Sequence, residues 1–191
     1  MKKTDLHIKG MVCPRCETVI RQEMAKLQVR VIAIQPGHAI VEVPRLLPQS
    51  TIAHQLRVHG FELLEDPNQQ LVEQIKNATL AYLRRRESAA VQGQEVETLS
   101  NFLAHSLGKS YSQLSKLFSR HEEKTLEHYY IRLRIERVKE LLDYGELNVG
   151  EIANKLGYSS VHYLSAQFKK VTHQSISDYR KNLRRSYFNE I

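Results

Sequence analysis

Two stretches of the sequence, VETLSNFLAHSLGKSYSQLSKLF at residues 96–118 and LNVGEIANKLGYSSVHYLSAQFKK at residues 147–170, share one plan. In each, a short helical pattern ends at a Leu-Gly pair. After a short turn, a second helical pattern carries Leu and Phe four residues apart. Two short helices joined in this way form a helix-turn-helix, so the sequence predicts this unit twice, near residues 96–121 and 147–171.

The segments around these two units are also expected to be helical. TLEHYYIRLRIERVKELLDY, residues 125–144, lies between them and is long enough for one connecting helix. QLVEQIKNATLAYLRRR, residues 70–86, carries apolar residues at helical spacing. It is either a dimerising helix or the opening helix of the C-terminal domain, and we favour the second. Residues 67–191 are therefore expected to form an all-α double helix-turn-helix domain.

This arrangement resembles the AraC/XylS-type DNA-binding domain, in which two helix-turn-helix units share a linker helix. The resemblance covers about residues 70–183. The matching residues lie in the linker helix and in and after the second unit: Arg134, Arg137, Leu141, Leu142, Ile152, Ala153, Leu156, Gly157, Tyr158, Phe168, Lys169, Lys170, Tyr179 and Arg180. The resemblance implies a bacterial, cytoplasmic transcription regulator that binds double-stranded DNA.

Three positions depart from that family. Glu123 and His173 stand where each half usually has Gly, and Ile176 stands where Pro is usual. A residue other than Gly costs about 1 kcal/mol at a helix end that needs a positive φ. We therefore expect the ends of the two recognition helices to differ from those of the family.

The resemblance also implies which residues contact DNA. A recognition helix contacts base edges from its N-terminal half. The matched positions are Ser112, Gln113, Ser115 and Lys116 in the first unit and Val161, His162, Ser165 and Ala166 in the second. Gln can pair with adenine, Lys with guanine, and the methyl groups of Val and Ala with thymine. Four further basic residues are expected at phosphates: Arg120, Lys169, Lys170 and Arg180.

The net charge supports a polyanionic partner. The chain carries a formal charge of +7 and has a pI near 9.4. After Leu147 there are seven basic residues against three acidic ones, and all but one of the seven lie at or beyond Lys169. The positive charge thus gathers toward the C-terminal end, although a basic surface alone does not establish DNA binding.

The first 66 residues have a different pattern. Short β-branched runs and two helical stretches occur in the order βαββαβ, with a Gln35-Pro36-Gly37 turn in the central hairpin. Both cysteines of the chain lie in GMVCPRC, residues 10–16, between the first strand and the first helix. These features resemble the heavy-metal-associated domain through Gly10, Met11, Cys13, Cys16, Gly60 and Phe61, with Val12 where Thr is usual. The resemblance implies an α+β ferredoxin-like N-terminal domain at residues 1–66.

The cysteine pair favours a soft metal ion. A thiolate binds metal, and both the adjacent helix N-terminus and Arg15 favour deprotonation. Two sulfur ligands suit Cu(I), Zn(II) or another thiophilic ion, but they leave a tetrahedral zinc site incomplete. A redox dithiol and a retained loop that contacts a ligand or partner remain alternatives. Four scattered histidines are treated as surface or packing residues and not as ligands: His7, His38, His54 and His59.

Several classes of protein are disfavoured. The sequence has no apolar run long enough for a signal peptide or a membrane span, and no set of catalytic residues or phosphate loop. We therefore expect a transcription regulator, with a possible homodimer, and not an enzyme or a membrane protein. Two alternatives stay open: a metal carrier or interaction protein without specific DNA binding, and a regulator whose first domain only dimerises or binds a partner.

Overall fold

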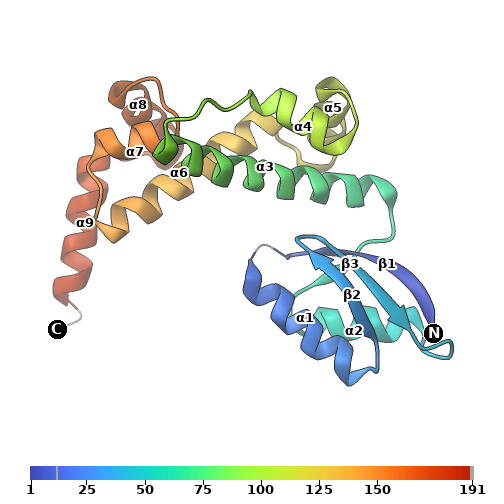
Figure 1. Cartoon of the computed structure of the whole chain (residues 1–191). Helices are drawn as coiled ribbons and strands as arrows, with labels where there is room; N and C mark the ends of the chain where they lie inside the picture. Colours follow the sequence, from blue (N-terminus) through green and yellow to red (C-terminus); the bar gives the residue numbers. More distant parts are fainter. Residues whose placement is uncertain (12, 190–191) are drawn as a thin grey trace. The chain divides into compact units, whose positions relative to one another are not determined.

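The structure is a computed structural model that describes residues 1–11 and 13–189. The chain divides into two compact units, residues 1–78 and 79–191, and the division falls inside helix α3 (Pro67–Gln92). Each unit is described by itself below (Figure 1). Among the described residues, no helix is long and apolar enough to cross a lipid bilayer.

The first unit is a four-stranded antiparallel sheet with two helices. Its elements are β1 (Lys2–Lys9), α1 (Pro14–Lys26), β2 (Arg30–Gln35), β3 (His38–Val43), α2 (Gln49–Val58) and β4 (Glu62–Leu63). The strands lie in the order β2-β3-β1-β4, with antiparallel pairing throughout. The expected βαββαβ order is confirmed.

The core of this unit follows from two periodicities. Side chains of a strand alternate between the two faces of the sheet, whereas helical residues three and four apart share one face. The buried residues accordingly alternate along β1 and β3 and recur at helical spacing in α1 and α2: Leu6, Ile8, Ala39, Val41, Val43, Ile20, Met24, Ile52 and Leu56. The two helices thus cover one face of the sheet (Figure 1).

Helix α3 begins in the first unit. Its N-terminus is capped by Asp66, whose carboxylate accepts the backbone N–H of Asn68 at 3.0 Å. Val72 and Ile75 are buried. The helix expected to open the C-terminal domain therefore has its first turns within the compact unit formed by residues 1–78.

The second unit is all-helical and contains two helix-turn-helix pairs. After α3 come α4 (Leu99–Leu107), α5 (Tyr111–Glu122), α6 (Leu126–Tyr144), α7 (Val149–Lys155), α8 (Val161–Thr172) and α9 (Ile176–Asn189). Helices α4 and α5 form the first pair, α7 and α8 form the second, and α6 is the expected linker. In five of these helices the N-cap side chain accepts a backbone N–H three residues on, as preferred at helix starts: Thr98, Ser110, Thr125, Asn148 and Ser160.

Each recognition helix is anchored by the predicted Leu and Phe pair. Leu114 and Phe118 of α5 and Leu164 and Phe168 of α8 have no exposed surface. In the second pair they pack in a core with residues of α6 and α7, including Ile135, Val138, Ile152 and Leu156. The opposite face of each recognition helix is consequently turned to solvent.

Both recognition helices end in a left-handed residue. Glu123 has φ 54° and His173 has φ 62°, close to the φ of 62° at Gly108, which ends α4. The expectation that these helix ends depart from the usual geometry is therefore wrong, because both residues accept the conformation that favours Gly. Ile176, the third departure, starts α9 and is buried.

Replacing either residue with Gly should stabilise the protein. Glu123→Gly and His173→Gly each remove the steric cost of a Cβ in the left-handed region, so the free energy of unfolding should rise by about 1 kcal/mol. Arg132→Gly, at an exposed position within α6, is the matched control and should lower it by about 1 kcal/mol. Urea titration measures all three, and destabilisation by the first two would contradict the assignment.

Candidate DNA interface and cysteine loop

The exposed face of α5 carries the residues expected to contact DNA in the first unit. Ser112, Gln113, Lys116 and Arg120 are exposed, and Ser115 is half-buried. Lys116 and Arg120 lie one turn apart, and neither forms a salt bridge with any described residue. This face offers hydroxyl, amide and cationic groups to an incoming ligand.

Gln113 has a second role that the sequence analysis missed. Its side-chain Oε1 accepts the backbone N–H of Ser110 at 3.2 Å, and Ser110 Oγ accepts the backbone N–H of Gln113 at 3.4 Å. The pair forms a capping box at the start of α5. Because bidentate pairing with adenine uses both the oxygen and the nitrogen of the amide, only the NH₂ group is free for a base in this conformation. The Ser-x-x-Gln spacing of residues 110–113 is typical of a capping box and could have predicted this role.

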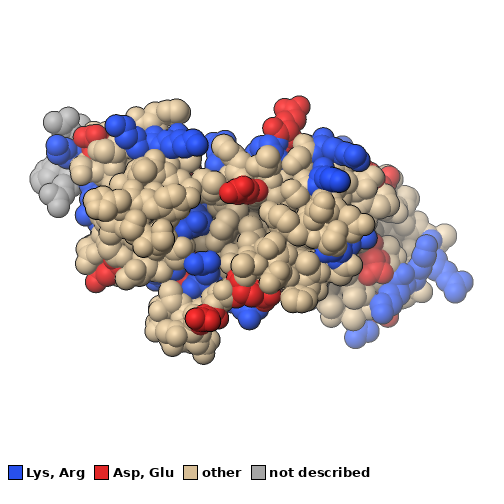
Figure 2. All heavy atoms as spheres, turned by 90° about the horizontal axis from the view of Figure 1, so that it is seen from above, with Lys and Arg blue, Asp and Glu red and all other residues tan. Residues whose placement is uncertain are grey.

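The exposed face of α8 is more apolar. Val161 and His162 are exposed at its first turn, with Ala166 one turn on, and Ser165 is half-buried. Tyr163 is 52% exposed beside them, although the sequence analysis did not select it. Lys169 and Lys170 follow, both exposed. Seen from above in Figure 2, Lys and Arg side chains lie in separate groups, over the part of the unit that carries α8 and over the part that carries α5.

Arg180 differs from the other three basic residues expected at phosphates. Its Nη2 donates to the backbone carbonyl of Leu147 at 3.1 Å, and the residue is half-buried in α9. A guanidinium has five N–H donors, so this bond leaves others available, but it fixes the side chain on the segment before α7. Lys169, Lys170 and Arg120 are the freer cations.

Two arginines that carry the family resemblance pack inside the second unit. The guanidinium carbon of Arg134 lies 3.6 Å from the centre of the Tyr158 ring, within cation–π range. Burial of Tyr158 raises its pKa to about 12. Arg137 donates from Nε and Nη2 to the carboxylate of Glu87 on α3, both at 2.9 Å, and this bond raises its pKa above the ordinary value. These contacts connect α6 to α3 and to the turn that follows α7.

The two cysteines meet at the start of α1. Cys13 is the N-cap residue, its Sγ lies 3.3 Å from Cys16 Sγ, and both are free thiols, half-buried. The hydrogen bond from the Cys16 side chain, and then that from the Cys16 backbone N–H, hold the pKa of Cys13 below its usual range. The Cys16 thiol in turn lies 3.7 Å from the carbonyl oxygen of Gly10. Val12, between Met11 and Cys13, lies outside the described residues.

Two of the histidines of the first unit contact carboxylates. His38 Nε2 lies 3.1 Å from Asp5 Oδ1, and His59 Nε2 lies 3.2 Å from Glu23 Oε1. Burial is the main cause that lowers the pKa of His7, whose ring is 4.9 Å from that of His38. Among residues 1–11 and 13–189, no group of three or more His, Cys, Asp or Glu side chains could hold a metal ion. The cysteine loop itself therefore offers two soft ligands.

Substitutions at Gln113 should separate its cap from its contact with DNA. Gln113→Glu keeps the acceptor of the capping box, so the free energy of unfolding should change by less than about 0.5 kcal/mol. It removes the NH₂ donor and adds a negative charge, so affinity for every DNA sequence should fall. Gln113→Ala loses the cap, at about 1 kcal/mol of stability.

His162→Ala tests base contact without a change in the cap. If Gln113 or His162 contacts a base, its replacement by Ala should weaken the preference for that base at one position of the site. The difference in binding free energy between the preferred base and the others should fall by about 1–3 kcal/mol. Competition binding with single-base variants of a selected DNA site measures this preference. Equal losses for selected and random DNA would show that these two side chains do not contact bases.

Comparison with known proteins supports the helix-turn-helix assignment. Residues 103–182 match a family described as a helix-turn-helix domain. The chain is 27% identical over 112 residues to the Msm operon regulatory protein of Streptococcus mutans, covering 59% of this chain and 40% of that protein. It is 35% identical over 81 residues to the raffinose operon transcriptional regulatory protein RafR of Pediococcus pentosaceus, covering 42% and 29% respectively.

A solved structure also matches the second unit in sequence. The C-terminal domain of AraT, a response regulator from Geobacillus stearothermophilus, is 30% identical, with 53% of this chain and 84% of that domain covered and a TM-score of 0.42. The chain spans less than half the length of the curated relatives named above. Residues 103–182, within the second unit, are therefore similar to a helix-turn-helix domain, and this part of the chain resembles regulatory proteins of operons.

Proposed function

We propose that this chain is a sequence-specific transcription regulator that binds double-stranded DNA with both helix-turn-helix units. The observation that carries the proposal is the duplication. The two recognition helices, α5 and α8, are capped, and each buries a Leu and Phe pair. The opposite face of each helix is exposed to solvent, and this face is polar on α5 and more apolar on α8. An exposed helix face of this kind fits the major groove, which is wide enough to admit an α-helix.

The two recognition helices favour different bases. On α5, Lys116 and the NH₂ group of Gln113 offer donors, which suit acceptors on purines. On α8, Val161 and Ala166 offer methyl groups, which suit the C5-methyl of thymine. Lys169, Lys170 and Arg120 supply phosphate contacts that set register and affinity. The bound site should thus have two dissimilar halves.

For the first unit we propose a ferredoxin-like fold of the heavy-metal-associated kind, with a thiophilic ion held by Cys13 and Cys16. The donor set fits, since two thiols lie 3.3 Å apart at a helix N-terminus and the pKa of Cys13 is lowered. A bound Cu(I) or Zn(II) ion would supply a positive charge shared by two thiolates. Further ligands would come from outside the loop, and a second copy of the chain in a homodimer is one source.

A route from this loop to α3 supports a regulatory role. The Cys16 thiol lies within hydrogen-bond range of the carbonyl of Gly10, and the backbone N–H of Gly10 donates to the Glu73 carboxylate of α3 at 3.4 Å. Glu73 is 7% exposed. A metal ion bound by the two thiols would therefore act next to the Gly10 and Glu73 contact, at the start of the helix that continues into the second unit.

DNA binding can be tested on the full chain with a duplex selected from a randomised library. Affinity should fall with salt, because bound Lys and Arg release counterions, and Lys169→Ala should reduce the slope of log K against log salt by about 1. Lys3→Ala, on the first unit, is the control and should leave the slope unchanged. Failure to select any preferred duplex, or binding that salt does not weaken, would overturn the proposal.

Metal coupling can be tested by titrating reduced protein with Cu(I) while DNA binding is followed in the same sample. Wild type should bind the ion tightly, and its DNA affinity should shift by about 1–3 kcal/mol. Both effects should disappear in Cys13→Ser and Cys16→Ser but persist in the surface control His54→Ala. Equal DNA affinity with and without metal would leave the first unit as a dimerising or partner-binding module.

A further inference from the structure

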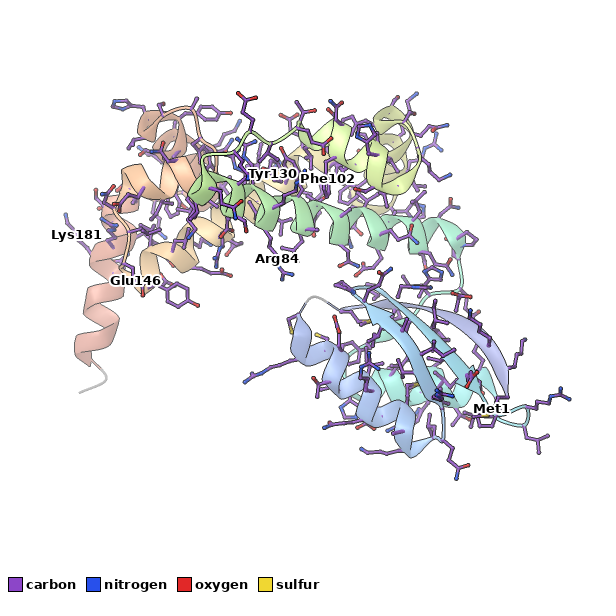
Figure 3. All side chains as sticks on the ribbon, viewed as in Figure 1. Met1, Arg84, Phe102, Tyr130, Glu146 and Lys181 are labelled. Atoms are coloured by element: carbon purple, nitrogen blue, oxygen red, sulfur yellow. The ribbon has the colours of Figure 1, made fainter. Side chains whose placement is uncertain are left out.

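Two side chains of α3 contact both helix-turn-helix pairs of the second unit. Tyr82 is 1% exposed, and its hydroxyl donates to the backbone carbonyl of Glu97 at 2.8 Å. Glu97 directly precedes Thr98, the N-cap of α4. The Tyr82 ring also packs 5.4 Å from Phe102 of α4 and 5.7 Å from Tyr130 of α6. Figure 3 shows Phe102 and Tyr130 on one side of α3, with Arg84 on the other.

Arg86, one turn further along α3, contacts the second pair. Its Nη2 donates to the backbone carbonyl of Gly157 at 3.2 Å, and its Nη1 donates to the hydroxyl oxygen of Tyr82 at 3.3 Å. Gly157 lies in the turn between α7 and α8 with φ 66°, and a Cβ at this position would overlap the guanidinium. The Gly of the Leu-Gly pair thus does more than allow a turn, since it also leaves room for Arg86.

These bonds form one continuous chain between the two pairs. It runs from the Glu97 carbonyl through the Tyr82 hydroxyl and the Arg86 guanidinium to the Gly157 carbonyl. Along the sequence, the two pairs are joined by the linker helix α6 alone. Phe118 of α5 and Phe168 of α8 both pack on residues of α6. The hydrogen-bonded chain through α3, called the brace below, is a second connection between the two pairs. In Figure 1, α4 lies above the middle of α3, and α7 lies near the C-terminal end of α3.

From this arrangement we infer that Tyr82 and Arg86 are positioning residues that set the separation of α5 and α8 on DNA. The inference rests on the proposed function, because it concerns two half-sites bound by one chain. Two linked recognition helices gain affinity from each other only when their separation matches that of the half-sites. Loss of the brace should therefore reduce the affinity gained from binding both half-sites and widen the range of half-site spacings that the protein accepts. The contacts within each half-site should stay intact.

The test uses the full chain and the duplex selected with wild-type protein, together with versions that carry only one half-site or one extra base pair between the two. Tyr82→Phe removes the hydroxyl but keeps the buried ring, and Arg86→Gln removes the guanidinium. Ser88→Ala is the matched control, because it also removes one hydroxyl from α3, and that hydroxyl bonds only to the backbone of its own helix, at Arg84. Arg86→Lys is the conservative variant and should retain part of the wild-type behaviour.

In Tyr82→Phe and Arg86→Gln, affinity for the full site should fall about five- to tenfold, the size expected from a lost hydrogen bond. Affinity for each half-site alone should stay within about twofold, and the penalty for the extra base pair should shrink. Equal losses on full and half-sites, or an unchanged spacing penalty, would overturn the positioning role. If wild type selects no preferred duplex, the proposed function fails instead.

The distance between the two recognition helices provides a readout that needs no DNA. Spin labels can be placed at Lys116→Cys and Lys169→Cys in the full chain with Cys13→Ser and Cys16→Ser. The distance distribution should be narrow in this background and broader when Arg86→Gln or Tyr82→Phe is added, and unchanged with Ser88→Ala. Equally narrow distributions in all four proteins would contradict the brace.

Discussion

The hydrogen-bonded chain from Glu97 through Tyr82 and Arg86 to Gly157 joins the two helix-turn-helix pairs to one helix. Its bonds differ in strength. Those from Arg86 are charge-assisted, whereas the bond from Tyr82 is between neutral groups, and all of these bonds are partly buried. The apolar contacts of Leu83 with the core of the second pair add to this brace. Because α3 contacts the segment before α4 and the turn between α7 and α8, it supports both helix-turn-helix pairs of the second unit.

The same helix also connects the two units of the chain. Its first turns belong with the sheet that carries the cysteine loop, and its later turns belong with the second unit. Glu73, which contacts Gly10, and the residues of the brace, Tyr82 and Arg86, belong to this one helix. Coupling between metal binding and DNA binding requires that metal favour one state over another by a difference in free energy. The titration of metal against DNA binding measures whether such a difference in free energy exists.

Periodicity in the sequence predicted most of the fold. The Leu and Phe pairs, the Leu-Gly turns and the β-branched runs each specify local structure, and the helices and strands follow them within a few residues. Side-chain partners between distant segments were not predictable. Arg86 and Gly157 are 71 residues apart, and neither has a local pattern that pairs them. Similarly, the exposed side chains of α5 and α8 follow from helical spacing, whereas the internal bond of Arg180 depends on where α9 packs.

The central claim is that both recognition helices bind DNA together, with a separation fixed by α3. Hydroxyl-radical footprinting of the full chain on its selected duplex tests this most directly. The account predicts two protected patches on one face of the duplex, about one helical turn or 10 base pairs apart, the spacing of successive major grooves. In Arg86→Gln, one patch should weaken while the other remains. A single protected patch in wild type, or two patches whose spacing varies freely between bound sequences, would contradict the account.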